Sequence, residues 1–290
     1  MRTGTTSWID PSRDLEGNVT QLAGSVEDIE LVLFDVKGYG NNLPDRAAIR
    51  RLAALAEEWG HTYTVHLPQD LCVDEDGTCP DGSIEKARQV IELTRDLHPW
   101  AYVAHLNGDA LLDHPSPSQC GRWRRRAEHA ARIVTGWLED PARLAVENIE
   151  RWDAANLAPV LEALPVSRCV DIGHLWLQRV DPLEHLNVWL DRTRVVHLHG
   201  LRDFPAPAGQ VFQPGLDHTS LARIPPAALD PVAACLTDRF EGVLTLEVFS
   251  IEDFDASRAA WDRACRRVSG GPPFRPAGSG PFRRKGPAPG

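Results

Sequence analysis

Histidines and acidic residues recur along the chain, each at or near the end of a short apolar run. The runs TYTVHLP, AYVAHLNG, LAVENIE, CVDIGH, VVHLHG and LTLEVF carry His66, His105, Glu147, Asp171 with His174, His197 with His199, and Glu247. The segment GLDHTSL adds Asp217 and His218, and an earlier run ends at Asp35. So many carboxylates packed together without cations would repel one another. Neutral imidazole and carboxylate are ligands that zinc, manganese and iron accept, and a set without cysteine is typical of a catalytic site. The pattern therefore predicts a catalytic site with divalent metal ions.

The elements that must position these residues are predicted to be strands alternating with helices. Strands are expected over 3–8, 29–35, 63–67, 101–106, 144–148, 167–172, 194–199 and 243–249. Helices are expected over 44–58, 83–97, 118–138, 153–164, 183–191, 224–236 and 252–268. Eight strands in this alternation favour an α/β fold of the (β/α)8 TIM-barrel type. The rival fold is an open doubly wound sheet, which usually has a glycine-rich phosphate loop after its first strand; none follows here.

In such a barrel the carboxyl ends of the strands form one face, where active sites are built. Residues far apart in the sequence are therefore expected to converge on one cavity. His197 and His199 point to the same side of their strand, because side chains repeat every two residues. Both reach the site, or one of them ligates a metal while the other holds a substrate oxygen. The remaining histidines, at 61, 98, 114, 129 and 185, lie in helices or their flanks and are interpreted as polar groups outside the site.

Composition predicts one globular domain followed by a tail. The chain has 290 residues, 42% hydrophobic and 25% charged, and residues 1–268 are expected to form the catalytic barrel. Residues 269–290 contain six Gly and six Pro, so this segment is predicted to be disordered. The net charge is −10, and the tail carries four basic residues and no acid, which leaves about −14 on residues 1–268. A surface this acidic argues against a nucleic-acid partner.

The cellular location is predicted from what the sequence lacks. No stretch is apolar enough for a membrane helix, and the first residues, MRTGTTSWIDP, have no apolar core of a signal peptide. The six cysteines have no paired metal-binding spacing and are interpreted as reduced thiols. We therefore expect a cytoplasmic protein without a membrane partner. Its oligomeric state is not indicated by the sequence.

The order of the polar residues resembles that of the xylose isomerase-like barrels, which include the endonuclease IV type of apurinic endonuclease. In those endonucleases a trinuclear zinc cluster is held by His, His, Glu, Asp, His, His, Asp, His and Glu. Here the matching residues are His66, His105, Glu147, Asp171, His174, His197, Asp217, His218 and Glu247. The endonucleases separate the loop Asp and His by one residue, whereas Asp217 and His218 are adjacent.

A closer resemblance is to the cobamide-remodelling phosphodiesterases of the same superfamily. GTTSWIDP, VEDIELVLFD, YTVHLPQDL, VVHLHG, LDHTSL and LEVFS are similar to that family's signatures and span most of residues 4–250. Those enzymes cleave the phosphoester in the nucleotide loop of cobamides such as pseudocobalamin. The family usually has Glu in the second strand where this chain has Asp35, which reaches one methylene less far.

The resemblance implies a site with two or three divalent ions, zinc first, with manganese or iron as alternatives. The expected ligands are His66, His105, Glu147, Asp171, His174, His197, His218 and Glu247. Glu147, Glu247 and His199 are the expected catalytic residues. Contacts with a corrinoid substrate are expected from residues near strand ends, namely Trp8, Asp35, Tyr39, Trp176 and Asp217.

Three functions are compatible with this pattern. The first is a metal-dependent phosphodiesterase that converts a cobamide to a cobinamide phosphate and a riboside, for corrinoid remodelling or salvage. The second is a sugar isomerase or epimerase with one metal, for which Glu147, Asp171, His197 and Glu247 suffice. A one-metal site of this kind gives no metal-binding role to His66, His105 or the Asp217–His218 pair. The third, apurinic endonuclease activity, needs a basic groove that this acidic chain does not supply.

Overall fold

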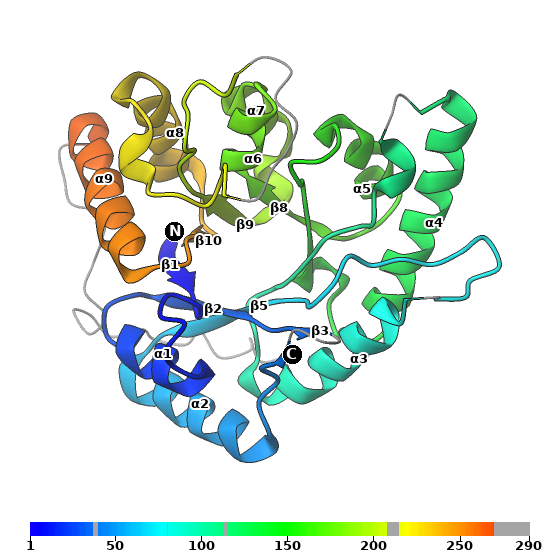
Figure 1. Cartoon of the computed structure of the whole chain (residues 1–290), viewed down its shortest axis with the longest axis horizontal. Coiled ribbons are helices and arrows are strands. Elements are labelled where there is room, and N and C mark those ends of the chain that lie inside the picture. Colours follow the sequence, from blue (N-terminus) through cyan, green and yellow to red (C-terminus); the bar gives the residue numbers. More distant parts are fainter. Residues whose placement is uncertain (37–39, 80, 113–114, 208–214, 270–290) are drawn as a thin grey trace, which may run out of the picture.

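Eight parallel strands close into a barrel in the computed structural model, which describes residues 1–36, 40–79, 81–112, 115–207 and 215–269 (Figure 1). Around the barrel the order is β1, β10, β9, β8, β7, β6, β5 and β2. Their bounds are β1 Arg2–Thr6, β2 Asp28–Val32, β5 Thr62–His66, β6 Tyr102–Ala104, β7 Leu144–Glu147, β8 Ser167–Asp171, β9 Thr193–Leu198 and β10 Val243–Leu246. The predicted (β/α)8 barrel is confirmed. Two further strands, β3 (Asp35–Val36) and β4 (Gly40–Asn41), pair antiparallel with each other.

Helices surround the barrel on its outer side (Figure 1). They are α1 Leu15–Leu22, α2 Arg46–Trp59, α3 Ser83–Thr94, α4 Pro117–Thr135, α5 Ala158–Glu162, α6 Ile172–Leu177, α7 Pro182–Trp189, α8 Pro226–Arg239 and α9 Ile251–Ser269. Short 3₁₀ turns lie at Arg95–Leu97, Asp109–Leu111, Pro141–Arg143, Ala154–Leu157, Leu190–Arg192 and Leu221–Arg223. Residues at the N-termini stabilise the first turns of several helices. The Asp45 carboxylate caps α2 by accepting the Ala48 N–H at 2.7 Å, and Pro182 opens α7, where its missing N–H costs no hydrogen bond.

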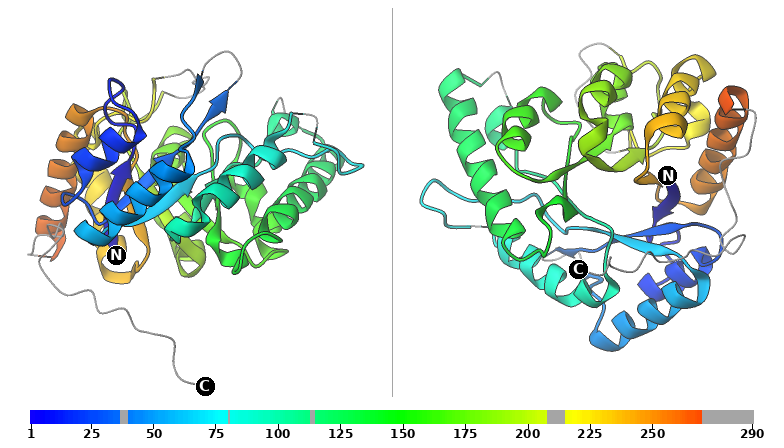
Figure 2. Two further views of the ribbon diagram at one scale, coloured as in Figure 1. Left: turned by 90° about the horizontal axis from the view of Figure 1, so that it is seen from below. Right: turned by 180° about the vertical axis from the view of Figure 1, so that it is seen from behind.

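The carboxyl ends of the strands share one rim. Val32 of β2 pairs with His66 of β5, and Asp171 of β8 pairs with His197 of β9, so strand ends lie level with one another. The N-terminus lies at the opposite end of the barrel from the β3–β4 hairpin, which stands above this rim (Figure 2). Side chains at these strand ends are thereby directed toward one opening.

Apolar residues form two cores. A large core lies between the strands and the surrounding helices, and a small one inside the barrel consists of Ala101, Val103, Ala145, Cys169 and Val195. The inner core is made of small and branched side chains because the barrel is narrow. Above it the inward positions become polar, which is where the predicted site residues begin.

The second strand ends earlier than predicted, at Val32 instead of Asp35. The Asn42 side chain binds both ends of the intervening turn, because its Oδ1 accepts the Phe34 N–H at 2.7 Å and its Nδ2 donates to the Val32 carbonyl at 2.8 Å. The chain leaves the barrel there, and Asp35 belongs to the β3–β4 hairpin.

Two helices were not expected from the sequence. Helix α1 has only eight residues and α6 only six, too few for a clear 3.6-residue period. The predicted tail, 269–290, lies outside the described residues except for Ser269, which ends α9. Within the described ranges, no helix combines the length and apolar character that crossing a membrane requires.

Candidate metal centre

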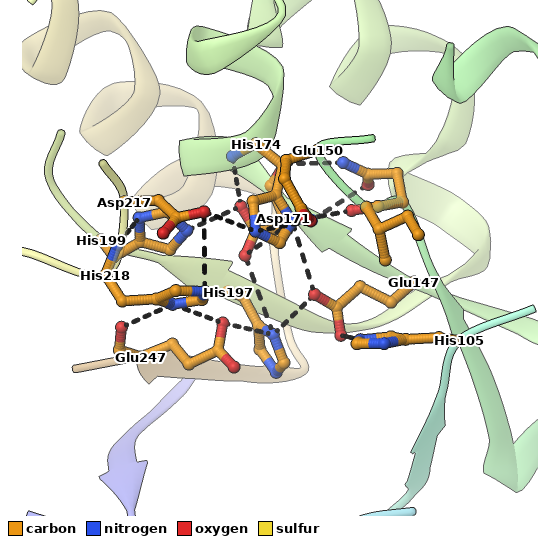
Figure 3. A network of polar contacts seen from close by, with 12 residues as sticks. His105, Glu147, Glu150, Asp171, His174, His197, His199, Asp217, His218 and Glu247 are labelled. Carbon is orange, nitrogen blue, oxygen red and sulfur yellow. Dashed lines mark hydrogen bonds and ion pairs between the residues drawn. The ribbon is translucent and has the colours of Figure 1, made fainter. Parts of the chain in front are cut away.

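Ten of the predicted polar residues meet at the carboxyl-end rim, contributed by β5 to β10 and the segments that follow them. Figure 3 labels all of them except His66. His66, Glu147 and Asp171 end their strands, and His105, His199 and Glu247 come just after theirs. His174 enters through the first turn of α6, where the Asp171 carboxylate accepts the His174 N–H at 2.6 Å. The expected convergence of distant residues is what the structure shows.

The first group of ligand atoms, which we call the central cluster, consists of Glu147, Asp171, His197 and Glu247. One atom from each lies within 4.8 Å of the others, and all four residues are buried. His197 Nδ1 lies 3.0 Å from Glu247 Oε2, 3.3 Å from Glu147 Oε1 and 3.9 Å from Asp171 Oδ2. Three carboxylates and one imidazole can hold a divalent cation.

Two further groups adjoin the central cluster. The two-histidine cluster is His66 and His105 with Glu147, whose Oε2 lies 3.5 and 3.2 Å from the two Nε2 atoms. The three-histidine cluster is His174, His199 and His218. Glu147 links the first of these to the central cluster, because it directs one carboxylate oxygen to each.

Asp171 links the central cluster to the three-histidine cluster. Its Oδ1 lies 3.2 Å from His199 Nε2, and its Oδ2 is the oxygen that faces His197. Asp217 Oδ2 lies 3.7 Å from His174 Nε2 and 4.0 Å from His218 Nε2. The adjacent Asp217 and His218 therefore both reach this cluster, although no residue separates them.

The second ring nitrogen of most site histidines is already bound. Besides His199, whose ring is described below, Nδ1 contacts a backbone carbonyl in His66 (Leu67, 2.9 Å), His174 (Asn148, 3.0 Å) and His218 (Glu247, 3.3 Å). His105 Nδ1 contacts the Asp70 carboxylate at 3.1 Å. A neutral imidazole that donates from one nitrogen offers a lone pair on the other, as metal-ligating histidines do. These four rings thus present Nε2 to the clusters.

His197 has the opposite orientation. Its Nε2 lies 3.0 Å from the Glu30 carboxylate, which also accepts a hydrogen bond from Thr245 Oγ1 at 3.2 Å. Nδ1 is left for the central cluster. Glu30 is fully buried inside the barrel and was not predicted as a site residue. It was missed because the strand was expected to contribute at its end, whereas Glu30 lies in the middle, on the inward side of Asp28–Val32.

His199 faces Asp171 with Nε2, and the hydrogen bonds of Nδ1 decide whether that nitrogen carries the ring proton. The His218 N–H approaches its Nδ1 at 3.0 Å, which places the ring proton on Nε2, facing Asp171. Alternatively, Nδ1 donates to the Gly200 carbonyl at 3.1 Å and Nε2 becomes a ligand. Burial would lower the pKa of His199, but the Asp171 carboxylate raises it to about 9. His197 and His199 thus both lie in candidate clusters.

Buried charge in these clusters favours bound cations. Burial alone would raise the pKa of Glu147, but His197 and His105 hold it well below its usual range. Asp171 Oδ2, His174 Nε2, His197 Nδ1, His199 Nε2 and Glu247 Oε2 are buried, and although they approach one another they form no hydrogen bond among the described residues. Such atoms are costly to bury unless another group satisfies them. The donor set therefore fits divalent metal ions.

The residues expected to contact substrate have different surroundings. Trp8 is half-buried at the rim, and Asp217 lies beside His174 of the three-histidine cluster. Asp35 lies on the hairpin, 3.6 Å from Lys86 Nζ, and is in none of the three clusters described above. Trp176 is only 7% exposed and packs edge-on against Phe204 at 5.8 Å, in the core instead of at the opening. Tyr39 lies outside the described residues.

Gly173 makes room for His199. A Cβ at Gly173 would lie 2.1 Å from His199 Cε1 and 2.4 Å from both ring nitrogens, closer than any real contact. We expect Gly173→Ala to push this imidazole out of the three-histidine cluster and weaken metal retention there by about 10- to 100-fold, the usual effect of losing a supporting group. Elemental analysis after dialysis measures this loss.

The matched control for this prediction is Gly121→Ala in α4, where the Cβ would meet only the end of Arg125 at 3.9 Å. Alanine favours a helix over glycine, so this variant should keep its metal and its thermal stability. Full metal content in Gly173→Ala would show that His199 does not hold an ion.

The model of one protein family matches most of the chain. Residues 26–268 match the family described as "Xylose isomerase-like TIM barrel". No curated protein sequence matches the chain.

Solved structures with the same fold belong to proteins of different activities. A D-tagatose 3-epimerase-like protein has a TM-score of 0.71 and 16% identity, covering 93% of this chain and 99% of its own. Endonuclease IV from Thermus thermophilus has a TM-score of 0.63 and 20% identity, and the alignment covers 90% of this chain and 98% of the endonuclease. A 3-keto-D-glucoside 4-epimerase from E. coli has a TM-score of 0.61 and 13% identity, and the alignment covers 91% of this chain and 97% of the epimerase. At these sequence identities, the similarity shows a shared fold and not a shared activity.

Proposed function

This chain belongs to the xylose isomerase-like TIM barrel family, and from the groups in its barrel mouth we propose that it is a multinuclear metal-dependent phosphodiesterase. The observation that carries the proposal is the continuity of the three clusters through Glu147 and Asp171. A phosphodiester offers several oxygens to neighbouring cations, and adjacent ions can stabilise both the attacking and the leaving oxygen of an in-line displacement. Shared carboxylates between clusters suit ions held side by side.

The chain's own residues would position these ions and the substrate. Glu147 would contribute to the two-histidine and central clusters and Asp171 to the central and three-histidine clusters, because each directs its two oxygens into different clusters. Glu247 would complete the central cluster, and Asp70 and Glu30 would fix the rings of His105 and His197. Bound divalent ions would supply an activated water and neutralise charge on the phosphoryl oxygens. In the overall reaction, a bond from the water oxygen to phosphorus would form as the bond between phosphorus and the ribosyl oxygen breaks, and the riboside would leave with a proton from that water.

The proposed substrate is a cobamide, cleaved to a cobinamide phosphate and a riboside. Support comes from the similarity of GTTSWIDP, YTVHLPQDL, VVHLHG and LEVFS to signatures of the cobamide-remodelling phosphodiesterases. The structure brings His66, His197, His199 and Glu247 of these segments to one rim, and the half-buried Trp8 of the first segment follows β1 there. Zinc is the proposed ion, with manganese or iron accepted by the same ligands.

A sugar epimerase is the second candidate function. The central cluster alone offers Glu, Asp, His and Glu to one metal, and two of the similar structures are those of an epimerase and an epimerase-like protein. The remaining histidines disfavour this candidate, because five of them would face the same opening without a metal to bind. Nuclease action on DNA is disfavoured by the net charge of −10.

The test incubates the metal-loaded protein with pseudocobalamin and with cobalamin. We expect a cobinamide phosphate and a free riboside, separated and identified by mass. Parallel reactions contain ketoses and an abasic DNA duplex at low salt. Turnover of a ketose without cleavage of any cobamide would replace the phosphodiesterase by the epimerase, and cleavage of the abasic duplex would replace it by a nuclease.

A further inference from the structure

Three aromatic rings form a continuous wall from the metal centre outward. We call Trp8, Phe34 and Phe249 the aromatic wall. The Phe249 ring lies 5.1 Å from the His218 ring, the Trp8 ring lies 6.3 Å from Phe249, and Phe34 stacks on Trp8 at 4.8 Å with an interplanar angle of 24°. The rings come from the segments after β10, β1 and β2, which are neighbours in the barrel.

The wall leads to a cavity of about 610 Å³. Trp8 and Phe34 line it, together with the starts of α1 and α2 and the β4 strand of the hairpin. Phe249 is 41% exposed, which is unusual for a large apolar side chain beside a buried polar site. The metal centre, the wall and the cavity are thus continuous along one side of the rim.

Charged side chains line the outer part of the cavity, where Arg13 pairs with Asp10 and Arg51 with Glu16. Three uncharged polar residues of the lining are also partnered. Asn18 accepts the Asp10 N–H at 2.9 Å and donates to the Asp10 carbonyl at 3.0 Å. Asn42 is bonded at both ends of its amide to Phe34 and Val32. Ser7 Oγ accepts the Val32 N–H at 3.0 Å. Recognition here would depend on flat apolar contact more than on hydrogen bonds from these side chains.

We propose that the aromatic wall binds the flat heterocyclic base on the riboside arm of the substrate. The inference rests on the proposed phosphodiesterase function and names the part of its substrate that this side of the rim accepts. The Phe249 ring lies 5.1 Å from the His218 ring and the Trp8 ring lies 6.3 Å from Phe249, so the wall begins beside the metal centre, where a base joined through ribose to a phosphate at that centre would lie. Bases stack well on tryptophan and phenylalanine whatever their edge pattern, because every base has a π-face.

The test compares two ligands that differ only in the base. Adenosine 5′-monophosphate and ribose 5-phosphate carry the same sugar and phosphate, and isothermal titration of the metal-loaded protein gives the affinity of each. We expect the nucleotide to bind at least about tenfold more tightly, the effect of stacking one base. Trp8→Leu and, separately, Phe249→Leu should remove this preference while ribose 5-phosphate binds as before.

Trp59→Leu is the matched control. Trp59 is 45% exposed at the end of α2, on the amino-end side of the barrel, so its loss should leave the preference unchanged. Phe249→Leu keeps the test decisive if Trp8→Leu does not fold, because the partly exposed Phe249 has little packing to lose.

The outcomes separate this inference from the proposed function. Equal affinity for the two ligands, no binding of either, or an unchanged preference in Phe249→Leu would overturn the base subsite even if cobamides are cleaved. A clear preference for the nucleotide that depends on the wall, in a protein that cleaves no cobamide, would support the subsite and count against the phosphodiesterase assignment.

Discussion

Glu147→Gln is expected to abolish hydrolysis, with a loss of about 10³-fold or more in kcat, because it alters two clusters at once. The Glu147 carboxylate directs Oε1 to the central cluster and Oε2 to His66 and His105. An amide has the same shape but carries no charge, and its NH₂ group repels a cation. Metal ions supply several kcal/mol of transition-state stabilisation, and each 1.36 kcal/mol is tenfold in rate.

Single-turnover rates and metal content measure this effect together. Glu92→Gln is the matched control, because Glu92 lies exposed on α3, where it forms an ion pair with Arg88 at 3.4 Å and belongs to none of the three clusters. It should retain both activity and metal. If Glu147→Gln kept its full metal content and hydrolysed within tenfold of the parent protein, Glu147 would not join the two clusters.

His66→Ala is expected to abolish phosphodiester cleavage while the barrel stays folded. The change removes a ligand from the two-histidine cluster but leaves the four ligands of the central cluster in place. His66 is partly exposed at the rim, so its loss opens little of the core. A multinuclear hydrolase depends on this position, whereas an epimerase with one metal in the central cluster does not.

Cobamide cleavage, thermal unfolding and bound metal are measured for this variant beside His129→Ala. His129 is exposed on α4 and belongs to none of the three clusters, so its loss should change none of these measurements. A His66→Ala protein that still cleaves cobamides would remove the two-histidine cluster from the mechanism.

The barrel and most of its polar rim could be predicted because their signal is local. Each apolar run is short and ends in a histidine or acid, and the rule that parallel strand ends share one face does the rest. His66, Glu147 and Asp171 indeed end β5, β7 and β8. Knowing that six runs end this way is enough to predict one convergent site, without any distance.

Residues whose role depends on the third dimension could not be predicted in this way. Glu30 acts on His197 from 167 positions away in the sequence, and Asp70 lies in a loop that reaches back to His105. Asp35 was expected at a strand end, but the hydrogen bonds of Asn42 end that strand at Val32. Trp176 was expected at the opening because it follows a strand. It instead belongs to the short helix α6, which begins directly after β8, and its side chain is buried in the core.

The number of metal ions per chain tests the central claim most directly. Protein prepared with zinc, freed of excess ions by dialysis and analysed for metal and protein should contain two or three ions per chain. Anomalous scattering from crystals should place them at Glu147–Asp171–His197–Glu247, at His66–His105–Glu147 and at His174–His199–His218. A single ion confined to the central cluster would contradict the multinuclear account and favour the epimerase.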